Sequence, residues 1–136
     1  MNHVEEGLVR EARKALPRAY APYSNYKVAA AIMAEDGRIF TGVNVENASY
    51  GLTICAERVA LFSAAADGCR SFTHLAVVSD DNENLPLPCG ACRQVLMEFS
   101  PEMKIIVAGK DDHGEMMSFT LAELLPFSFE IKNSQE

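Results

Sequence analysis

Two cysteines three residues apart are the side chains of this sequence best placed to do chemistry. They stand in the segment Pro88-Cys89-Gly90-Ala91-Cys92. Proline suits the first turn of a helix, and residues three apart share a helix face, so we expect both thiols near a helix N-terminus. Free amides and the helix dipole favour a thiolate there. Alone, the pair is compatible with half of a zinc site, a redox couple or coincidence.

A second stretch, Cys55-Ala56-Glu57-Arg58, is also expected to open a helix after an irregular segment. If the two helices enter the same end of a sheet, Cys55 joins Cys89 and Cys92, with a carboxylate nearby. Three protein ligands and one open position are typical of a catalytic zinc, whereas four ligands mark a structural site. Cys69 could supply a fourth thiolate, so a structural zinc module that binds a partner stays open as an alternative.

The elements that must position these groups follow from hydrophobic periodicity. Apolar residues at helical spacing predict a helix over 4–16, disturbed at Pro17. Two runs over 26–34 and 38–45, joined by an Asp-Gly pair, predict a β-hairpin. The first run is nearly all apolar, so we expect it inside the sheet with both faces covered.

Further along the chain, a helix is predicted over 55–66, with Val59, Phe62 and Ala66 as its apolar face. A buried strand at 74–79 and a loop at 80–87 precede the Cys-x-x-Cys helix. That helix buries Cys92, Val95, Leu96 and Phe99, and Ser100-Pro101 ends it.

Strands at 103–108 and 116–119 and a short helix at 121–125 complete the prediction. Met116 and Met117 are expected to fill the core. The element order predicts an α/β protein, a single domain over 1–136 built as a three-layer α-β-α sandwich around a central mixed five-stranded sheet.

Composition excludes several classes of function. The 136 residues are 49% hydrophobic and carry a net charge of -7, without a Lys/Arg-rich run, which argues against nucleic-acid binding. The acidic N-terminal residues do not form a signal peptide, and no apolar run approaches the length of about 20 residues that a membrane span needs. We therefore expect a cytoplasmic protein with no membrane contact, whose four cysteines are reduced or metal-bound.

From about residue 20 to residue 129 the sequence closely resembles the cytidine deaminase family, in its small, all-cysteine, homotetrameric form. The resemblance is carried by Asn44-Val45-Glu46-Asn47-Ala48-Ser49-Tyr50, by Cys55-Ala56-Glu57-Arg58 and by residues 88–94. It implies cytosine nucleosides as the substrate class, a cytidine deaminase fold, and one Zn²⁺ per subunit held by Cys55, Cys89 and Cys92.

The resemblance implies hydrolysis of cytidine and 2′-deoxycytidine to uridine nucleosides and ammonia, in pyrimidine salvage. Zinc lowers the pKa of a water molecule towards neutrality, and Glu57 would pass protons to N3 and then to the departing amine. Zinc with three thiolates carries a net charge of -1, which opposes ionisation of the water. In the family an arginine at the position of Arg58 donates to ligand sulfurs, so Arg58 is expected to offset this charge.

Substrate-binding roles are implied for Tyr26, Asn44, Glu46, Ala48, Tyr50, Ala56 and Phe129. In the family, the positions of Asn44 and Glu46 bind the ribose 3′-hydroxyl, which is why the deoxynucleoside is also expected as a substrate. Those of Ala48 and Tyr50 reach a sugar site of a neighbouring subunit in a homotetramer with shared sites.

The positions of Tyr26 and Phe129 cover the pyrimidine in the family. Tyr26 replaces the commoner phenylalanine, and Ala29 stands where glycine is usual, so preference among cytosine nucleosides stays open. A deaminase of a modified cytosine nucleoside, as in blasticidin-S deaminase, is the nearest alternative. That relative lacks the stretch matching residues 46–50, which favours cytidine.

Overall fold

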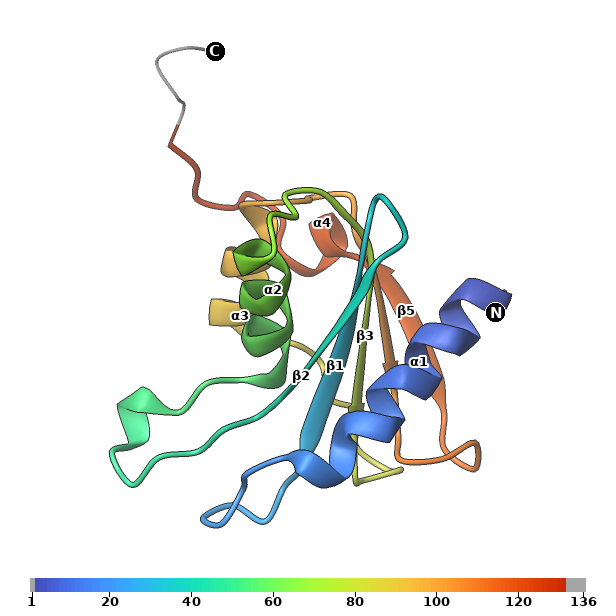
Figure 1. Cartoon of the computed structure of the whole chain (residues 1–136), viewed down its shortest axis with the longest axis vertical. Coiled ribbons are helices and arrows are strands. Elements are labelled where there is room, and N and C mark those ends of the chain that lie inside the picture. Colours follow the sequence, from blue (N-terminus) through green and yellow to red (C-terminus); the bar gives the residue numbers. More distant parts are fainter. Residues whose placement is uncertain (1, 132–136) are drawn as a thin grey trace.

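Five strands form one mixed sheet in the order β2-β1-β3-β4-β5 in the computed structural model, which describes residues 2–131 (Figure 1). β3 and β4 run parallel, and the other neighbouring pairs are antiparallel. The elements in chain order are α1 (His3–Ala15), η1 (Leu16–Arg18), β1 (Val28–Ala34), β2 (Ile39–Val43), η2 (Tyr50–Leu52), α2 (Ala56–Ala66), β3 (Phe72–Ser79), α3 (Gly90–Met97), β4 (Lys104–Ala108), β5 (Met116–Thr120) and α4 (Leu121–Leu124).

Helices cover both faces of the sheet, with α1 on one side and α2 and α3 on the other (Figure 1). Because side chains alternate along a strand, β1 serves both layers. Ala29 and Ala31 pack with the apolar face of α1, whereas Ala30 and Ile32 pack with the residues of α2. The predicted three-layer α-β-α sandwich, and the burial of β1 within it, are therefore confirmed.

The predicted hairpin is also confirmed, since β1 and β2 pair in antiparallel register from Ala29↔Val43 to Met33↔Ile39. Gly37 occupies the turn at φ +93°, a left-handed conformation that favours glycine. The Asp36 side chain accepts a hydrogen bond from the amide of Arg38 and closes the turn.

The predicted apolar face of α2 is wrong. Its buried face consists of Ala56, Glu57, Ala60, Leu61 and Ala64, while the larger side chain of Phe62 is 48% exposed. The reason is a close approach between elements, because β2 passes so near α2 that only small residues fit between them. Gly42 marks the place, since a Cβ added there would lie 2.7 Å from the carbonyl oxygen of Ala56.

The expectation that Met116 and Met117 fill the core is likewise wrong for this chain. Both lie on β5, an edge strand, and are 42% and 46% exposed. An edge strand has a neighbouring strand on one side only, so its apolar side chains can stay exposed. The type of the side chains alone did not reveal this. Among residues 2–131, none of the helices combines the length and apolarity needed to cross a membrane.

Candidate metal centre and substrate cavity

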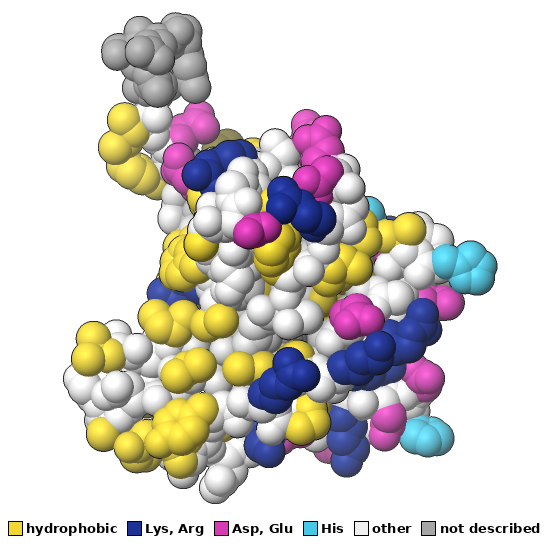
Figure 2. All heavy atoms as spheres, in the orientation of Figure 1, with side chains coloured by type: hydrophobic (Ala, Val, Ile, Leu, Met, Phe, Trp, Pro, Cys, Tyr) yellow, Lys and Arg dark blue, Asp and Glu magenta, His cyan; other side chains and the backbone are white. Residues whose placement is uncertain are grey.

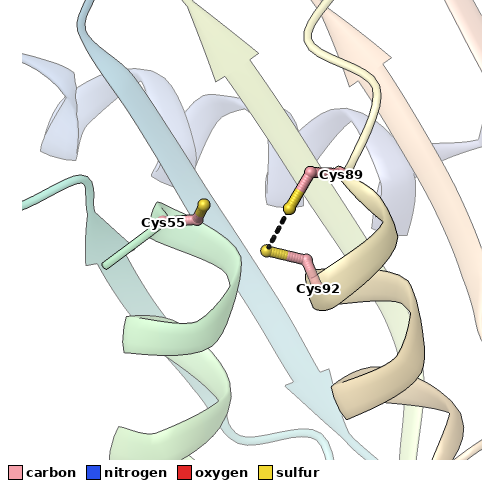
Figure 3. A group of neighbouring side chains, drawn as sticks. All are labelled: Cys55, Cys89 and Cys92. Carbon is pink, nitrogen blue, oxygen red and sulfur yellow. Dashed lines mark hydrogen bonds between the residues drawn. The ribbon is translucent and has the colours of Figure 1, made fainter. Parts of the chain in front are cut away.

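Two helix N-termini bring three thiols together. Cys55 is the N-cap of α2, Cys89 is the N-cap of α3, and Cys92 lies in the first turn of α3. The sulfur atoms of the three residues all lie within 4.8 Å of one another, and those of Cys89 and Cys92 are 3.5 Å apart (Figure 3). A tetrahedral zinc with Zn–S bonds of about 2.3 Å requires sulfur separations of about 3.8 Å. The donor set therefore fits one zinc ion.

Cys69 does not belong to this cluster. It is buried in the core just beyond the C-terminal end of α2, whereas Cys55 lies at the N-terminal end of the same helix. Within the part of the chain that the structure describes, the candidate metal group contains Cys55, Cys89 and Cys92. A four-thiolate structural site is therefore not supported.

The thiols differ in their affinity for protons. The pKa of Cys55 is lowered to about 5, mainly because the Cys92 thiol hydrogen-bonds to it and also because the Arg58 guanidinium lies beside it. The Nη2 atom of Arg58 is 3.6 Å from the Cys55 sulfur. The pKa of Cys92 is raised, because that thiol donates to Cys55 and is buried. The metal-free cluster thus favours the thiolate at Cys55, and zinc must displace the proton of Cys92 when it binds.

Arg58 is the cation next to these sulfurs. Its Nε is buried and, among the described residues, has no hydrogen-bond partner, while the contact with Cys55 raises the pKa of the guanidinium. A guanidinium this close to a thiolate stabilises the negative charge of the cluster. The position agrees with the charge-compensating role expected for Arg58, which stays a prediction.

Glu57 follows Cys55 on the first turn of α2 and is 5% exposed. Burial raises the pKa of its carboxyl group to about 7, and the neighbouring Cys55 thiolate adds to the shift. A carboxyl group that titrates near neutrality can both accept and donate a proton at physiological pH.

A cavity of about 400 Å³ opens beside the thiols and Glu57. That volume lies in the range of small-molecule sites. The residues lining it are Tyr26, Val28, Asn44, Thr53, Ile54, Cys55, Ala56, Glu57, Leu85, Pro86, Leu87 and Cys89. The structure thus brings Tyr26, Asn44 and Ala56, which were predicted from the sequence, to the same cavity as Glu57.

Other lining residues were not anticipated. Thr53 and Ile54 directly precede Cys55, and residues 85–87 directly precede the Cys-x-x-Cys segment, so nearness to the motifs was a usable signal. Val28 carried no such signal, because its place in the cavity depends on how β1 pairs within the sheet.

Asn44 and Glu46 differ in their surroundings. Asn44 is buried, accepts a hydrogen bond from the amide of Val28 (3.0 Å) and donates one to the carbonyl oxygen of Tyr26 (2.9 Å). Glu46 does not line the cavity, because its carboxylate is bound by the amide of Tyr23 (2.9 Å) and by the amide and hydroxyl of Ser24. These hydrogen bonds, that of the Ser24 hydroxyl first, lower the pKa of Glu46.

The remaining predicted substrate residues lie outside the cavity of their own chain. Ala48 precedes η2 on an exposed segment, and Tyr50, within η2, is 91% exposed. Phe129 is 72% exposed, and its carbonyl oxygen accepts a hydrogen bond from Gln94 of α3 (2.8 Å). One chain therefore does not bring these side chains to the cavity that Glu57 lines.

A three-thiol cluster and a buried carboxyl group, both presented by helix N-termini at one end of a mixed sheet, define a zinc-dependent deaminase of the class that acts on nucleobases. Comparison with known proteins identifies the family. Residues 2–109 match the family described as "Cytidine and deoxycytidylate deaminase zinc-binding region". The chain belongs to this family.

Similar proteins cover nearly the whole chain. The cytidine deaminase of Sporosarcina psychrophila is 48% identical over 91% of this chain and 90% of its own length. A probable cytidine deaminase of Dictyostelium discoideum is 44% identical, with 95% and 86% covered. The solved structure of cytidine deaminase from Burkholderia pseudomallei matches with a TM-score of 0.86 and 45% identity, covering 95% of this chain and all of that one.

Proposed function

We propose that the protein is a zinc-dependent hydrolase that deaminates cytidine and 2′-deoxycytidine to uridine and 2′-deoxyuridine with release of ammonia. The observation that carries this proposal is the position of Glu57, a buried carboxyl group that lines one cavity together with Cys55 and Cys89 of the three-thiol cluster. The relatives named cytidine deaminase support the same activity over most of the chain.

Cys55, Cys89 and Cys92 would hold one Zn²⁺ per subunit, which when bound supplies the Lewis-acid chemistry that makes water a nucleophile near neutral pH. Glu57 accepts one proton of the attacking water and delivers it to N3 of the pyrimidine. It then takes the second proton from the oxygen now on C4 and delivers it to the amino group. The C4–N bond breaks, ammonia leaves, and the N3 proton stays in the uridine product.

The remaining cavity residues suit a nucleoside. We assign the ribose 3′-hydroxyl to Asn44, which lines the cavity, and to Glu46 once its carboxylate exchanges the Ser24 contact for the sugar. Tyr26, which precedes β1, and Ala56, which opens α2, would contact the pyrimidine. A hydroxyl held by both an amide and a carboxylate is a stringent requirement, since a buried polar group left unpaired is costly.

We propose further that the protein assembles as a homotetramer with shared sites. Exposed apolar side chains gather on the side of the molecule that carries α2 and the η2 segment (Figure 2). Tyr50, Leu52 and Phe62 are 91%, 65% and 48% exposed, and exposed apolar side chains that gather on one face are typical of a protein–protein interface. In the assembly Ala48 and Tyr50 would reach the sugar site of a neighbouring subunit, and Phe129 would cover a pyrimidine. Light scattering behind size exclusion tests this, and a monomeric mass contradicts it.

Pyrimidine salvage and a cytoplasmic location complete the proposal. Salvage follows from the product, since uridine nucleosides re-enter pyrimidine nucleotide synthesis. The four cysteines are free thiols, which favours a reducing compartment. Fractionation of cells into cytoplasmic and secreted material tests the location.

The deciding experiment measures the fall in near-ultraviolet absorbance of cytidine, deoxycytidine and blasticidin S with wild type, Glu57→Gln and the matched control Glu6→Gln. Glu6 is exposed on α1, far in the fold from the cavity, so its variant should behave as wild type. Glu57→Gln should lose about 10²- to 10⁴-fold in kcat, the usual contribution of a proton-transferring group. Equal activity of Glu57→Gln and wild type on all substrates would overturn the proton transfer.

Activity on the different substrates and the zinc content of cysteine variants distinguish the alternatives. Activity on blasticidin S alone would indicate a deaminase of a modified nucleoside instead. Zinc content should fall in Cys89→Ala and stay unchanged in Cys69→Ala. Zinc loss in Cys69→Ala would favour the structural, partner-binding alternative.

A further inference from the structure

Asn82, just after β3, fits against two glycines from another part of the chain. A Cβ added to Gly109 would collide with Oδ1 of Asn82 and lie 2.8 Å from its Cα. A Cβ added to Gly114 would lie 3.0 Å from the same Oδ1 and 3.0 Å from the carbonyl oxygen of Asn82. These separations are too short for most real side-chain contacts, so the notch between the two glycines accepts Asn82 only because neither has a side chain.

Hydrogen bonds fix Asn82 in this notch. Its Nδ2 donates to Oδ1 of Asp111 (2.9 Å), and its Oδ1 accepts from the amide of Asp111 (3.4 Å). The same Asp111 oxygen accepts from the amide of His113 (2.9 Å), which holds the carboxylate in place. These hydrogen bonds contribute to lowering the pKa of Asp111, with the His113 amide first, so the acceptor stays ionised.

Arg13 of α1 holds the other side of the notch. Its Nε donates to the carbonyl oxygen of Gly109 (3.1 Å), and its Nη2 donates to that of Asp111 (2.8 Å). Its Nη1 forms an ion pair with Asp112 (2.7 Å). The side chain of Arg13 is 19% exposed, so its bonds to the two carbonyl oxygens are partly shielded from water, whereas the Asp112 side chain is 90% exposed. Hydrogen bonds from α1 and from the segment after β3 therefore hold the notch together, and we call Asn82, Gly109, Asp111 and Gly114 the Asn82 lock.

The lock sits at the root of the loop that forms one wall of the cavity. Leu85, Pro86 and Leu87 line the cavity, and they follow Asn82 by a few residues. At the other end of the loop, Nε of Arg93 donates to the carbonyl oxygen of Pro88 (2.7 Å), which secures the approach to Cys89 independently. The loop is thus held at both ends, by the lock at Asn82 and by Arg93 near Cys89, while Leu85 also packs against the core. Of the two end contacts, the lock is the one away from the thiols.

We propose that Asn82 is a positioning residue, which sets the wall of residues 85–87 against the substrate through the lock. The proposal rests on the proposed deamination, since the wall matters only if the cavity takes the nucleoside. A loosened wall must be ordered each time substrate binds, and that cost applies equally to the ground state and the transition state. Loss of the lock therefore raises KM and leaves kcat nearly unchanged.

The first test compares Asn82→Ala with Asn84→Ala. Asn84 lies in the same loop, but its side chain bonds only to Asp81 within that loop (3.1 Å). Asn82→Ala should raise KM for cytidine about tenfold, in line with the cost of ordering a short loop, with zinc content as in wild type. Asn84→Ala should leave KM within about twofold of wild type, as an exposed substitution does. A merely destabilising change would instead lower the active fraction and kcat, without changing KM.

Two further variants keep the proposal falsifiable if removal of the Asn82 amide disturbs folding. Asn82→Asp preserves the shape of the side chain but places a second carboxylate next to that of Asp111. The two negative charges repel, so the variant should raise KM as Asn82→Ala does. Adding Asp111→Asn to Asn82→Asp restores a donor opposite an acceptor, and KM should return towards wild type. Failure of the double variant to recover would overturn the proposal.

Hydrogen exchange separates a failure of this proposal from a failure of the proposed function. The backbone amides of residues 83, 84, 85 and 87 should exchange faster in Asn82→Ala than in wild type or Asn84→Ala, whether or not substrate is present. If wild type deaminates no cytosine nucleoside, the proposed function fails, while faster exchange in Asn82→Ala still shows that the lock holds the wall. Unchanged exchange and unchanged KM in Asn82→Ala would overturn the role of Asn82.

Discussion

Gly42→Ala should damage both stability and activity, because β2 touches the backbone of α2 at this glycine. A Cβ at Gly42 would collide with the backbone nitrogen of Ala60 and lie 2.7 Å from the carbonyl oxygen of Ala56 and 2.9 Å from the carbonyl carbon of Val59. All three atoms belong to the helix backbone, so none can turn away as a side chain would. The helix must move or the strand must bend.

The size of the effect follows from these distances. Restoring an ordinary contact of about 3.5 Å requires a shift of about 1 Å between β2 and α2. Overpacking of this kind costs about 3 kcal/mol, the upper end of its usual range, which corresponds to a fall in Tm of about 10 °C. The shift also carries Cys55 and Glu57, both at the start of α2, and a misplacement of about 1 Å can cost about 100-fold in activity.

Thermal unfolding and cytidine turnover of the zinc-loaded protein, at one protein concentration, measure both effects. Gly7→Ala is the matched control, since Gly7 lies inside α1 and a Cβ there would meet only the end of the Arg10 side chain, 3.7 Å away. The same substitution should stabilise the protein there by about 1 kcal/mol, because alanine favours the helix. The same Gly→Ala substitution should therefore lower the stability at Gly42 and raise it at Gly7.

A Gly42→Ala protein with the Tm and kcat of wild type would refute the reasoning. It would mean that β2 and α2 separate at little cost, and that the close approach does not position the candidate site. Loss of stability with full activity would refute only the predicted loss of activity, since α2 would then have kept Glu57 in place.

Three further predictions concern charged groups. Glu57→Gln should stabilise the zinc-free protein, and the gain should grow as pH rises from about 4.5 to about 7. Burial raises the pKa of Glu57 to about 7, so over that interval its carboxyl group ionises in the unfolded chain but not in the folded one, which lowers the stability of wild type. Unfolding measured at several pH values checks this, and a gain independent of pH contradicts it. Arg58→Gln should keep the fold but weaken zinc retention about 10- to 100-fold, measured as zinc content after dialysis against a chelator, because the guanidinium stabilises the Cys55 thiolate. Unchanged zinc content and kcat would count against that role. Glu5→Gln should lose stability near pH 7 and match wild type in acid. The hydrogen bond from Lys104 (2.7 Å) lowers the pKa of Glu5, so the pair stabilises the fold above the ordinary pKa of a glutamate and stops doing so as pH falls through the lowered pKa. A stability difference that persists in acid would argue against the pair.

Much of the fold could be predicted because it depends on local pattern. The hairpin turn at Gly37, the helices that begin after Cys55 and Cys89, and the buried run of β1 follow from residues near one another in the sequence. The apolar face of α2 could not be predicted in the same way. Phe62 is the larger apolar residue, yet alanines are buried, because the space left by β2 decides which face of the helix turns inward.

The candidate site was likewise predictable only where it depends on local sequence. The residue types and spacing in Cys55-Ala56-Glu57-Arg58 and in the Cys-x-x-Cys segment indicated zinc chemistry, and they indicated it through local helix geometry. The cavity wall at residues 85–87 and the hydrogen bonds of Glu46 with Ser24 had no comparable pattern in the chain. The roles of Ala48, Tyr50 and Phe129 stay predictions, since one chain does not bring these side chains to the cavity.

The sequence by itself determined which groups are the candidates for the chemistry, because a thiol at a helix N-cap and a carboxyl two residues later are set by a few neighbouring residues. Only the tertiary structure decided that the thiols of α2 and α3 meet, that Glu57 is dehydrated enough to titrate near neutrality, and that Asn82 fits a notch made by Gly109 and Gly114. Each of these depends on segments far apart in the chain. Their contact depends on how the layers pack, and short-range patterns carry no information about that packing.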